Sequence, residues 1–399
     1  MNSRWLTVIG IGEDGRAGLG DAARAALEGA ELVVGGHRHL SLVGPLRARS
    51  EVWQSPLAAT LERIAAWRGR RCVVLASGDP SWFGIARLLR EHFGAEALTV
   101  LPAPAAFSLA AVRLGWPLEE VTCLSAHGRP LAALHRHLQR GRRLFVLTDG
   151  ADGPAAIGAL LVAAGFEDAA VTVLERLGGA AERVSRHRAD AIAGRFAELN
   201  LVAVDLGGCA GTGLARVAGL VDGAYEHDGQ LTKSELRALA LARLAPLPGE
   251  RLWDVGAGSG AVAIEWLRAE AGTSAIAVER EPERSQRIRR NAARLGVPEL
   301  TVVEGTAPAC LAGLPQPQAV FVGGGCRDEG LLEACWAALP PGGRLVAHAV
   351  TLEGERALLG FQARHRGELC RIGLAHAEPV GRFTGWRPTM PVTQLAARR

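Results

Sequence analysis

The stretch Trp253-Asp-Val-Gly-Ala-Gly-Ser-Gly260 ends a predicted strand in an acidic residue and then places three glycines at alternate positions before a predicted helix. Glycines let the backbone of such a turn approach a ligand closely, and the N-terminus of the following helix offers backbone N–H groups. A tight turn alone would explain three glycines in five residues less well than a loop that binds a cofactor does. We therefore expect a cofactor loop formed by Gly256, Ala257, Gly258, Ser259 and Gly260.

Two cofactor classes fit this loop from the residues alone. Glu279 ends the next predicted strand, nineteen residues after Gly260, where a carboxylate can accept hydrogen bonds from ribose hydroxyls. Gly256-x-Gly258-x-x-Ala261 also passes as a dinucleotide fingerprint. Asp254 before the first glycine, the compact G-x-G-x-G form and a terminal antiparallel hairpin favour S-adenosylmethionine, and a methyltransferase over a dehydrogenase.

The second half of the chain reads as a doubly wound α/β sheet. Apolar runs predict strands at 251–255, 275–279, 300–303, 319–322 and 344–350, and helix-period stretches predict helices at 261–269, 282–295, 329–339 and 352–365. Thr232-Lys-Ser-Glu235 reads as a capping box that opens a helix over 234–244, and the Thr232 hydroxyl can cap that helix and still face a ligand. The run Val303–Ala307 would place a loop over an adenine. Two final runs, near 368–375 and 392–395, predict an antiparallel closing hairpin.

The first half repeats the alternation of strands and helices. Strands are predicted at 6–9, 32–34, 72–76, 98–101, 144–147, 170–174 and 199–206, with helices at 21–28, 56–68 and 155–164. Gly207-Gly-Cys-Ala-Gly-Thr-Gly213 follows the last strand and has no apolar periodicity. We therefore expect a first domain over residues 1–206, a linker over 207–222 and a second domain over 223–399.

Two loops in the first half are candidate cofactor contacts. Gly10-Ile-Gly-Glu-Asp-Gly15 formally matches a dinucleotide motif, but no acidic residue ends the following strand, so we do not expect NAD there. Ser77-Gly-Asp-Pro80 follows an apolar strand. From the residues alone, Asp79 as helix N-cap and Pro80 as first helical residue explain this loop equally well.

Composition excludes several classes of protein. Of the 399 residues 48% are hydrophobic, enough for two full cores, and 45 basic against 41 acidic residues leave a net charge of +4, too small to indicate a nucleic-acid partner. No apolar run approaches the about 18 residues of a membrane-spanning helix, and the N-terminus does not read as a secretory signal, so we expect a cytoplasmic protein. Seven scattered cysteines without a C-x-x-C pair indicate neither a disulfide framework nor a zinc site. Lys233 is the only lysine, so nearly all of the positive charge is carried by arginine. Two explanations fit: coding bias, or a need for bidentate recognition of carboxylates by arginine.

Five motifs of the first half recur in this order in a known family: Gly10–Gly15, Ala76–Gly84, Pro102–Phe107, Ser125–Arg129 and Leu147–Gly150. This half resembles the tetrapyrrole methylases, whose two small α/β lobes hold S-adenosylmethionine between them. The resemblance makes the loop after the strand 72–76 an expected cofactor contact, through Gly78, Asp79, Pro80 and Gly84. Glu13-Asp14 stands where the family usually has Pro-Gly.

The second half resembles the decarboxylating methylase that partners this family. The shared motifs lie at 226–233, 254–260, 263–266, 321–325, 347–353 and 381–387. The last, Gly381-Arg-Phe-Thr-Gly-Trp-Arg387, is far more specific than the glycine loop. The fused order is similar to that of the decarboxylating precorrin methyltransferases of aerobic cobalamin biosynthesis, and the resemblance covers almost the whole chain.

The resemblance implies methylation of precorrin-6Y at carbons 5 and 15 with loss of carbon dioxide from the acetate on ring C, giving precorrin-8X. It implies two S-adenosylmethionine sites, no metal, a polycarboxylate tetrapyrrole substrate, no nucleic-acid or membrane partner, and a homo-oligomer. In the second half it implies cofactor contacts at Thr232, the glycine loop, Glu279 and Ala307. It implies substrate contacts at Gln230, Gly324, Arg382 and Arg387. His348 is expected to handle a proton or to hydrogen-bond the substrate, with a buried, satisfied histidine as the equal alternative.

Three functions stay open from the sequence. The first is a bifunctional enzyme with two cofactor sites. The second gives the second half a different methyl acceptor, a small molecule or an RNA. The third makes the first half a non-catalytic tetrapyrrole-binding module that feeds a single-site methyltransferase.

Overall fold

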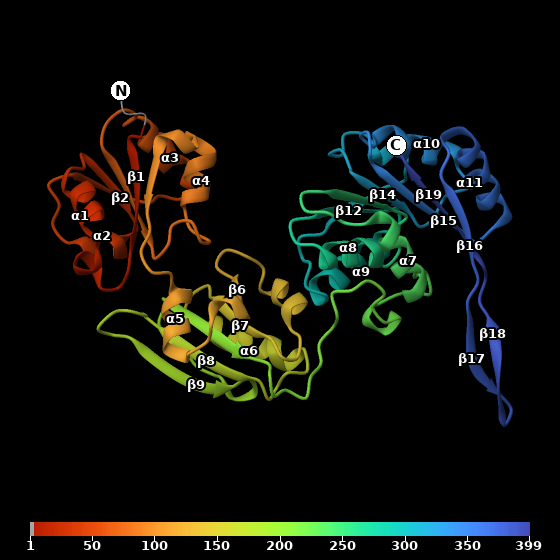
Figure 1. Cartoon of the computed structure of the whole chain (residues 1–399), viewed down its shortest axis with the longest axis horizontal. Helices are drawn as coiled ribbons and strands as arrows, with labels where there is room; N and C mark the ends of the chain where they lie inside the picture. The colour runs from red at the N-terminus through yellow and green to blue at the C-terminus, as the bar shows by residue number, and fades with distance from the viewer. Residues whose placement is uncertain (1–3) are drawn as a thin grey trace. The chain divides into compact units, whose positions relative to one another are not determined.

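The computed structural model describes residues 4–399, which divide into two compact units (Figure 1). The first unit comprises the chain up to Arg129 together with Arg140–Thr212, and the second comprises Pro130–Gln139 together with Gly213–Arg399. No helix within residues 4–399 combines the length and the apolarity that crossing a bilayer requires. The same residues contain no group of three or more His, Cys, Asp or Glu side chains placed to hold a metal ion.

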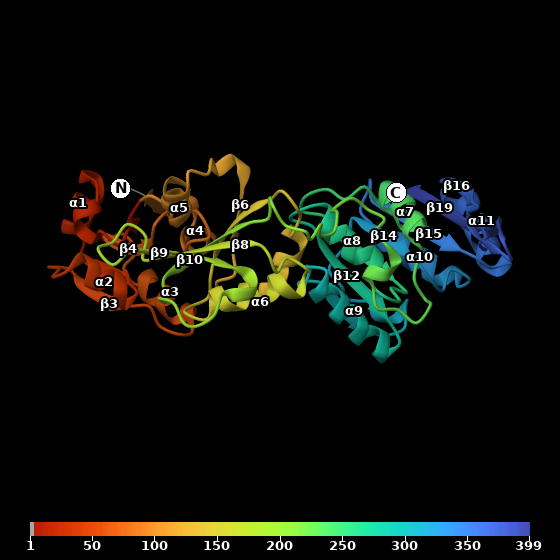
Figure 2. The ribbon, with the colours of Figure 1, turned by 90° about the horizontal axis from the view of Figure 1, so that it is seen from below.

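The first unit begins with a parallel sheet in the order β3-β2-β4-β1-β5, which we call the first lobe. Figure 2 labels β3 and β4 of this lobe together with its helices α1–α4. Its elements are β1 (Leu6–Ile11), α1 (Asp21–Glu28), β2 (Leu32–Gly35), α2 (His37–Val43), β3 (Arg49–Val52), α3 (Leu57–Ala65), β4 (Cys72–Ser77), α4 (Ala86–Phe93) and β5 (Leu98–Leu101). Because every neighbouring pair is parallel, the carboxyl ends of the strands meet at one edge. The loops that follow β1, β2, β4 and β5 are therefore neighbours, and such an edge is where open α/β sheets bind ligands.

A second, mixed sheet completes the first unit and forms its second lobe. The order is β6-β7-β10-β8-β9, in which β6 and β7 run parallel and the other neighbours run antiparallel. The elements are α5 (Ala106–Leu114), β6 (Val121–Ser125), β7 (Arg143–Leu147), α6 (Gly153–Ala163), β8 (Ala170–Glu175), β9 (Arg183–Arg188) and β10 (Asn200–Asp205). Phe107 of α5 packs in one core with Phe145 of β7.

The second unit is a seven-stranded sheet in the order β13-β12-β11-β14-β15-β19-β16. Its strands are β11 (Arg251–Val255), β12 (Ser274–Glu279), β13 (Thr301–Glu304), β14 (Ala319–Val322), β15 (Arg344–Ala349), β16 (Glu368–Ile372) and β19 (Val392–Arg398). The first five are parallel, and β19 runs antiparallel to both of its neighbours. Strands β11, β12, β14 and β15 are largely buried because helices cover both faces of the sheet, which is why they read as continuous apolar runs, whereas the edge strand β13 is partly exposed.

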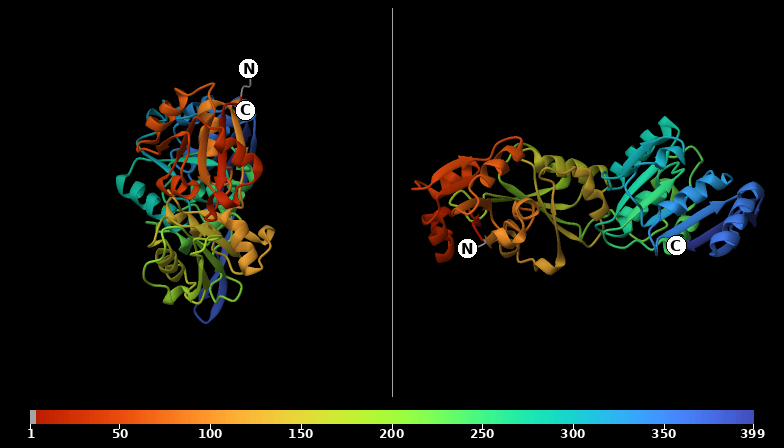
Figure 3. Two further views of the ribbon diagram at one scale, coloured as in Figure 1. Left: turned by 90° about the vertical axis from the view of Figure 1, so that its left-hand side faces the viewer. Right: turned by 90° about the horizontal axis from the view of Figure 1, so that it is seen from above.

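Five helices form the two covering layers of this sheet. They are α7 (Ser234–Leu244), α8 (Ala261–Ala269), α9 (Pro282–Arg294), α10 (Glu329–Ala338) and α11 (Leu352–His365). The first three contribute to one core and the last two to the core on the opposite face. Between β16 and β19 the chain forms a two-stranded ribbon, β17 (Ala375–Val380) and β18 (Phe383–Pro388), which extends beyond the sheet (Figures 1 and 3).

The predicted α/β class and the antiparallel closure of the second sheet are confirmed. The strands that the sequence analysis missed are β3, β6, β9 and the β17–β18 ribbon. Each is a sheet edge or an exposed ribbon whose side chains are mostly not buried, so none carries an apolar run. The predicted capping box was wrong, because Lys233 rather than Thr232 is the N-cap of α7 and no side chain caps that helix.

The predicted linker 207–222 is packed on the second unit over its later part. Leu220 is buried there, and Gly219 and Leu220 donate their backbone N–H groups to Glu265 over 2.6 and 3.2 Å. Asp222 pairs with buried Arg237 over 2.9 Å. These residues are therefore part of the second unit rather than a free tether, and the domain boundaries stay a prediction.

Candidate functional site

The glycine loop of the second unit lies where β11 ends, at the carboxyl edge of the sheet. Gly256, Gly258 and Gly260 have φ values of +70°, +60° and +77°, a backbone region that other residues rarely adopt. The N–H groups of Gly256 and Ala257 both donate to the Val278 carbonyl of β12, over 3.0 and 3.1 Å. Ser259 is buried. The predicted loop thus turns tightly between two strand ends.

Two other segments approach the loop so closely that a side chain at its glycines would make tight contacts. A Cβ on Gly256 would lie 3.1 Å from the backbone nitrogen of Gly324, in the glycine run after β14. A Cβ on Gly258 would lie 3.0 Å from the carbonyl oxygen of Gln230, ahead of α7. The structure therefore brings the predicted cofactor loop together with two of the predicted substrate contacts, Gln230 and Gly324.

Glu279 ends β12 beside the loop and is 5% exposed. Its Oε2 accepts from the Gly258 N–H over 2.9 Å, and its Oε1 accepts from the N–H groups of Arg280 and Glu281 over 3.0 and 3.1 Å. A carboxylate offers about four lone-pair sites, so these bonds leave about one for a ligand. Glu279 therefore supports the loop, and its predicted contact with a ribose stays a prediction.

Asp254, at the end of β11, lies beside the glycine loop and is a further candidate site residue. It is 1% exposed, and its Oδ2 accepts from the Ala263 N–H of α8 over 3.0 Å. Its Oδ1 has no hydrogen-bond partner in the part of the chain that the structure describes. Burial raises the pKa of this carboxyl to about 7. The nearby Glu279 carboxylate adds to this rise, whereas the hydrogen bond from Ala263 lowers the pKa. The acidic residue before the first glycine was the sequence signal for it.

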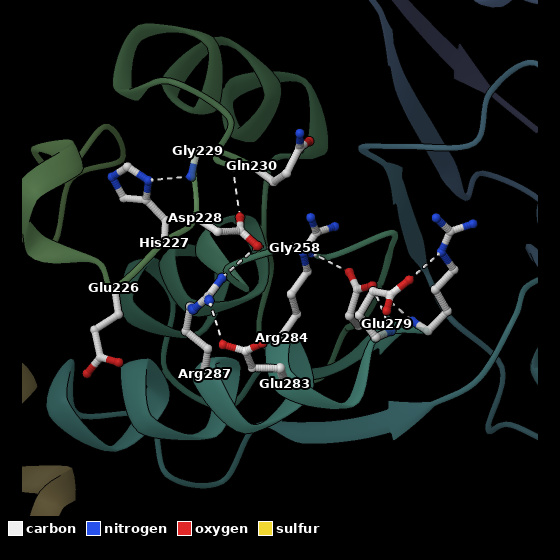
Figure 4. A network of polar contacts seen from close by, with 12 residues as sticks. Glu226, His227, Asp228, Gly229, Gln230, Gly258, Glu279, Glu283, Arg284 and Arg287 are labelled. Carbon is white, nitrogen blue, oxygen red and sulfur yellow. Dashed lines mark hydrogen bonds and ion pairs between the residues drawn. The ribbon is translucent and has the colours of Figure 1, made fainter.

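The segment before α7 is fastened over the loop by α9 (Figure 4). Asp228 accepts from Arg284 over 2.8 Å and pairs with Arg287 over 2.9 Å, and these guanidinium groups hold its carboxyl pKa well below the ordinary value. The second Asp228 oxygen accepts from the Gln230 N–H over 3.1 Å. Asn291 of α9 bonds both to backbone atoms of Glu226 and to the Ser259 carbonyl. The Gln230 backbone next to Gly258 is therefore positioned by side chains of α9.

Thr232 lies next to a buried ionic cluster around Arg237. Arg237 is 0% exposed and donates to Glu265 over 2.8 Å, to Asp222 over 2.9 Å, and to the carbonyl oxygens of Thr232 and Leu220. Thr232 itself is half-buried. Its carbonyl position is thus determined by Arg237, while its hydroxyl keeps the predicted role toward a cofactor.

His348 lies near the end of β15, in register with Gln394 of β19. It is 8% exposed, and its Nε2 lies 2.9 Å from Gln394 Oε1. Its ring meets the Phe321 ring edge-on at a centroid distance of 5.1 Å. Burial lowers the pKa of His348, so the imidazole is neutral at neutral pH. The geometry agrees with the buried, satisfied histidine, and a role in proton transfer stays a prediction.

The other predicted contacts of the second unit lie on separate segments. Ala307 follows β13 and packs partly against the core beside it. Arg382 and Arg387 belong to the exposed β17–β18 ribbon, where Arg387 pairs with Glu378 over 2.8 Å and the Arg382 guanidinium lies 5.1 Å from the Phe383 ring centroid. The ribbon also exposes Trp386, so it carries both aromatic and cationic groups.

In the first unit, three backbone segments meet at the carboxyl edge of the first lobe. The Gly78 N–H donates to the Ile11 carbonyl over 3.0 Å, and the Ala103 N–H donates to the Gly78 carbonyl over 3.2 Å. A Cβ on Gly10 would overlap the Gly78 carbonyl oxygen and lie 2.6 Å from the Ala103 nitrogen. Gly78 has φ +55°, and its Cβ would lie 3.2 Å from the Pro104 oxygen. The two glycine-containing loops of the sequence analysis therefore meet.

The helix-start alternative for Asp79 and Pro80 was wrong. Helix α4 begins only at Ala86, and Asp79 Oδ1 instead accepts from the Ser81 N–H over 2.8 Å, closing a turn. Gly84 packs against Pro80 so closely that a Cβ there would overlap the Pro80 backbone. The residues from Asp79 to Gly84 therefore form an irregular loop beside the edge.

An ionic group that the sequence analysis did not single out lies at the same edge. Arg38 at the start of α2 pairs with Glu13 and donates to the Ser77 hydroxyl over 2.6 Å. The His39 Nε2 lies 2.9 Å from the same hydroxyl. Burial, together with the Arg38 charge, lowers the pKa of His39 to about 4. This group links the loops after β1, β2 and β4.

Both edges fit an adenosine-type cofactor with a cationic sulfonium. In the second unit, the unpartnered Asp254 oxygen and the Glu279 carboxylate offer hydrogen-bond acceptors beside a loop without side chains at its glycines. In the first unit, the absence of a Cβ at Gly10 lets the loops after β1 and β4 pack closely together, and Gly78 is only partly buried at this edge.

Each half of the chain matches one family of known proteins. Residues 6–193 match the tetrapyrrole (corrin/porphyrin) methylases, and residues 223–399 match the precorrin methyltransferase domain. The chain is 51% identical to a Sinorhizobium sp protein named precorrin-6Y C(5,15)-methyltransferase [decarboxylating], and the match covers 98% of this chain and 96% of that protein. Two relatives match shorter parts. One is the cobalt-precorrin-7 C(5)-methyltransferase of Salmonella typhimurium, which is 33% identical; the match covers 45% of this chain and 88% of the relative. The other is a Pyrobaculum aerophilum protein named "Probable cobalt-precorrin-6B C(15)-methyltransferase (decarboxylating)", which is 34% identical; the match covers 42% of this chain and 88% of the relative.

Proposed function

The chain belongs to the family of decarboxylating precorrin-6Y C5,15-methyltransferases, and we propose that its two units divide the reaction between two S-adenosylmethionine sites. It is an S-adenosylmethionine-dependent C-methyltransferase of cobalamin biosynthesis, and its reaction combines methylation with decarboxylation. The first unit methylates carbon 5. The second unit methylates carbon 15 and removes carbon dioxide from the ring C acetate.

Two observations support this division. The carboxyl edge of each unit has glycines where a side chain is disfavoured, by a collision at Gly10 and by positive φ with tight neighbours at Gly78 of the first unit and at Gly256 and Gly258 of the second. In addition, one relative is named for methylation of carbon 5 alone, and another is named for methylation of carbon 15 with decarboxylation. Each aligns with less than half of this chain. The presence in one chain of two separate parallel-sheet edges, each with a glycine-containing loop, is the observation that carries the proposal.

The residues of each unit bind and orient rather than form covalent bonds. Bound S-adenosylmethionine supplies an electrophilic methyl group on a positively charged sulfur. In the second unit, Glu279 and the glycine loop hold the adenosine and amino-acid ends, with the unpartnered Asp254 oxygen nearby. Alignment of two reacting centres lowers a barrier by up to about 7–11 kcal/mol. Arg382 and Arg387 on the ribbon bind carboxylates of the tetrapyrrole, because guanidinium groups pair with carboxylates in bidentate fashion.

Cofactor stoichiometry tests the proposal. Calorimetry on the full chain should give two S-adenosylmethionine molecules per chain, and the product formed from precorrin-6Y should show by mass spectrometry two added methyl groups and the loss of carbon dioxide. A stoichiometry of one, with one methyl group added, would instead support a non-catalytic first unit that only binds the tetrapyrrole.

A further inference from the structure

Two aromatic side chains beside the Gly78 loop lie at the surface of the first unit without a role in the proposed function. Trp82 and Phe83 are 38% and 40% exposed, although such rings are usually much more buried. Phe83 has φ +56°, a backbone conformation that costs a bulky residue about 1–3 kcal/mol. A strained and exposed ring next to a cofactor edge indicates that its position serves a ligand.

Both rings are supported by one buried side chain. The Trp82 and Phe83 ring centroids lie 4.9 and 6.0 Å from that of Phe107, which is 1% exposed on α5. Phe107 in turn stacks with Phe145 of β7 at 6.4 Å. The exposed pair is therefore anchored on the aromatic core of the second lobe, although its own chain segment follows β4 of the first lobe.

A guanidinium group completes this surface from the second lobe. Arg129, on the loop after β6, lies 4.8 Å from the Phe83 ring centroid and is exposed. Within residues 4–399 it forms no ion pair, whereas Arg38 at the same edge is neutralised by Glu13. The positive charge of Arg129 is thus available to an anionic ligand that lies on the rings.

We propose that Trp82, Phe83 and Arg129 form the tetrapyrrole-binding surface of the first unit. The rings contact the conjugated face of the macrocycle, and Arg129 binds one of its peripheral carboxylates. The inference rests on the proposed function, in which the first unit acts on the polycarboxylate tetrapyrrole. It adds the residues that place the macrocycle beside the Gly78 loop.

Steady-state kinetics on the full chain test this surface. With S-adenosylmethionine saturating, Arg129→Gln should raise the KM for precorrin-6Y in carbon 5 methylation at least about fivefold while kcat changes less than about twofold. Arg129→Lys should recover most of the loss because it restores the charge. Phe83→Leu should raise the same KM. Arg188→Gln, on β9 at the opposite edge of the sheet from β6, is the matched control and should leave KM unchanged.

Separate outcomes test the inference and the proposed function. If the wild-type chain methylates carbon 5 and both Arg129→Gln and Phe83→Leu keep its KM, the surface is not the substrate site, while the two-site function stands. If the wild-type chain adds no methyl group at carbon 5, the two-site function fails, and an absorbance titration with precorrin-6Y decides the inference. Weaker tetrapyrrole binding by Arg129→Gln than by Arg188→Gln supports the surface, and equal binding overturns it.

Discussion

The Gly258 N–H donates to Glu279 Oε2 over 2.9 Å, which fastens the glycine loop of the second unit to the end of the neighbouring strand. The other Glu279 oxygen accepts two further backbone N–H groups. One buried carboxylate thus shapes the loop and, in the proposed function, also accepts a hydrogen bond from the cofactor. Binding and stability should therefore change together when it is removed.

Glu279→Ala should weaken S-adenosylmethionine binding at the second unit roughly tenfold or more, because charge-assisted hydrogen bonds contribute about 1.5–3 kcal/mol each. It should also lower the thermal stability of this unit, since three backbone N–H groups lose their acceptor. Calorimetry and thermal unfolding on the full chain measure both effects. Glu283→Ala, at an exposed position of α9, is the control and should change neither. Unchanged affinity in Glu279→Ala would remove this residue from the cofactor site.

Gly78→Val should abolish methylation at carbon 5 and leave carbon 15 methylation and decarboxylation intact. The added side chain combines a φ of +55° with a Cβ only 3.2 Å from the Pro104 oxygen, at the edge where the cofactor is expected. Product masses distinguish the outcomes. Gly69→Val introduces a side chain at φ +83° in open space before β4, and it should keep both methylations. Persistence of both methylations in Gly78→Val would contradict the first cofactor site.

Arg237→Met should destabilise the second unit by about 3–5 kcal/mol, because it leaves buried Glu265 and Asp222 without their counter-charge. Arg243→Met is the matched change on the same helix. Arg243 is half exposed and pairs with exposed Glu368, so its loss should cost less than about 1 kcal/mol. Denaturant unfolding of the full chain measures the difference, and equal losses would show that the cluster is not essential to stability.

A fragment spanning residues 213–399 should unfold at a higher temperature than one spanning 223–399. The longer fragment keeps the Gly219 and Leu220 N–H groups that bond Glu265 and the Asp222 partner of Arg237. The shorter one leaves these buried charges less satisfied, which costs stability. Equal melting temperatures would restore the view of 207–222 as a plain linker.

The first unit should lose stability as the pH falls from about 6.5 to about 4. The pKa of His39 is lowered from 6.5 to about 4 by burial and by Arg38, so in this range the unfolded chain binds a proton that the folded chain does not. His39→Asn should flatten this part of the profile. Denaturant unfolding at pH 7 and at pH 4.5 gives the comparison, and parallel profiles for the two proteins would contradict the buried neutral imidazole.

Much of the fold was predictable because the central strands are buried on both faces. Their apolar runs and the helix-period stretches between them placed α1, α7, α8 and α11 at the observed bounds. The edge strands β3, β6 and β9 and the β17–β18 ribbon were not predicted, because strands with mostly exposed or half-exposed residues carry no continuous apolar run. The glycines of the cofactor loop were equally visible, since a positive φ and close backbone approach both demand glycine.

The sequence by itself determined the α/β class, the glycine loop and the family, because burial periodicity, backbone freedom and shared motifs are all local properties of the chain. Only the tertiary structure decided that Asp254 keeps an unpartnered oxygen, that Glu279 supports the loop through the Gly258 N–H, and that Gln230 and Gly324 border Gly258 and Gly256. It likewise brought Arg129 over Phe83 from a different lobe. These relationships join residues far apart in the chain, and their energies depend on burial and distance, which no stretch of sequence specifies.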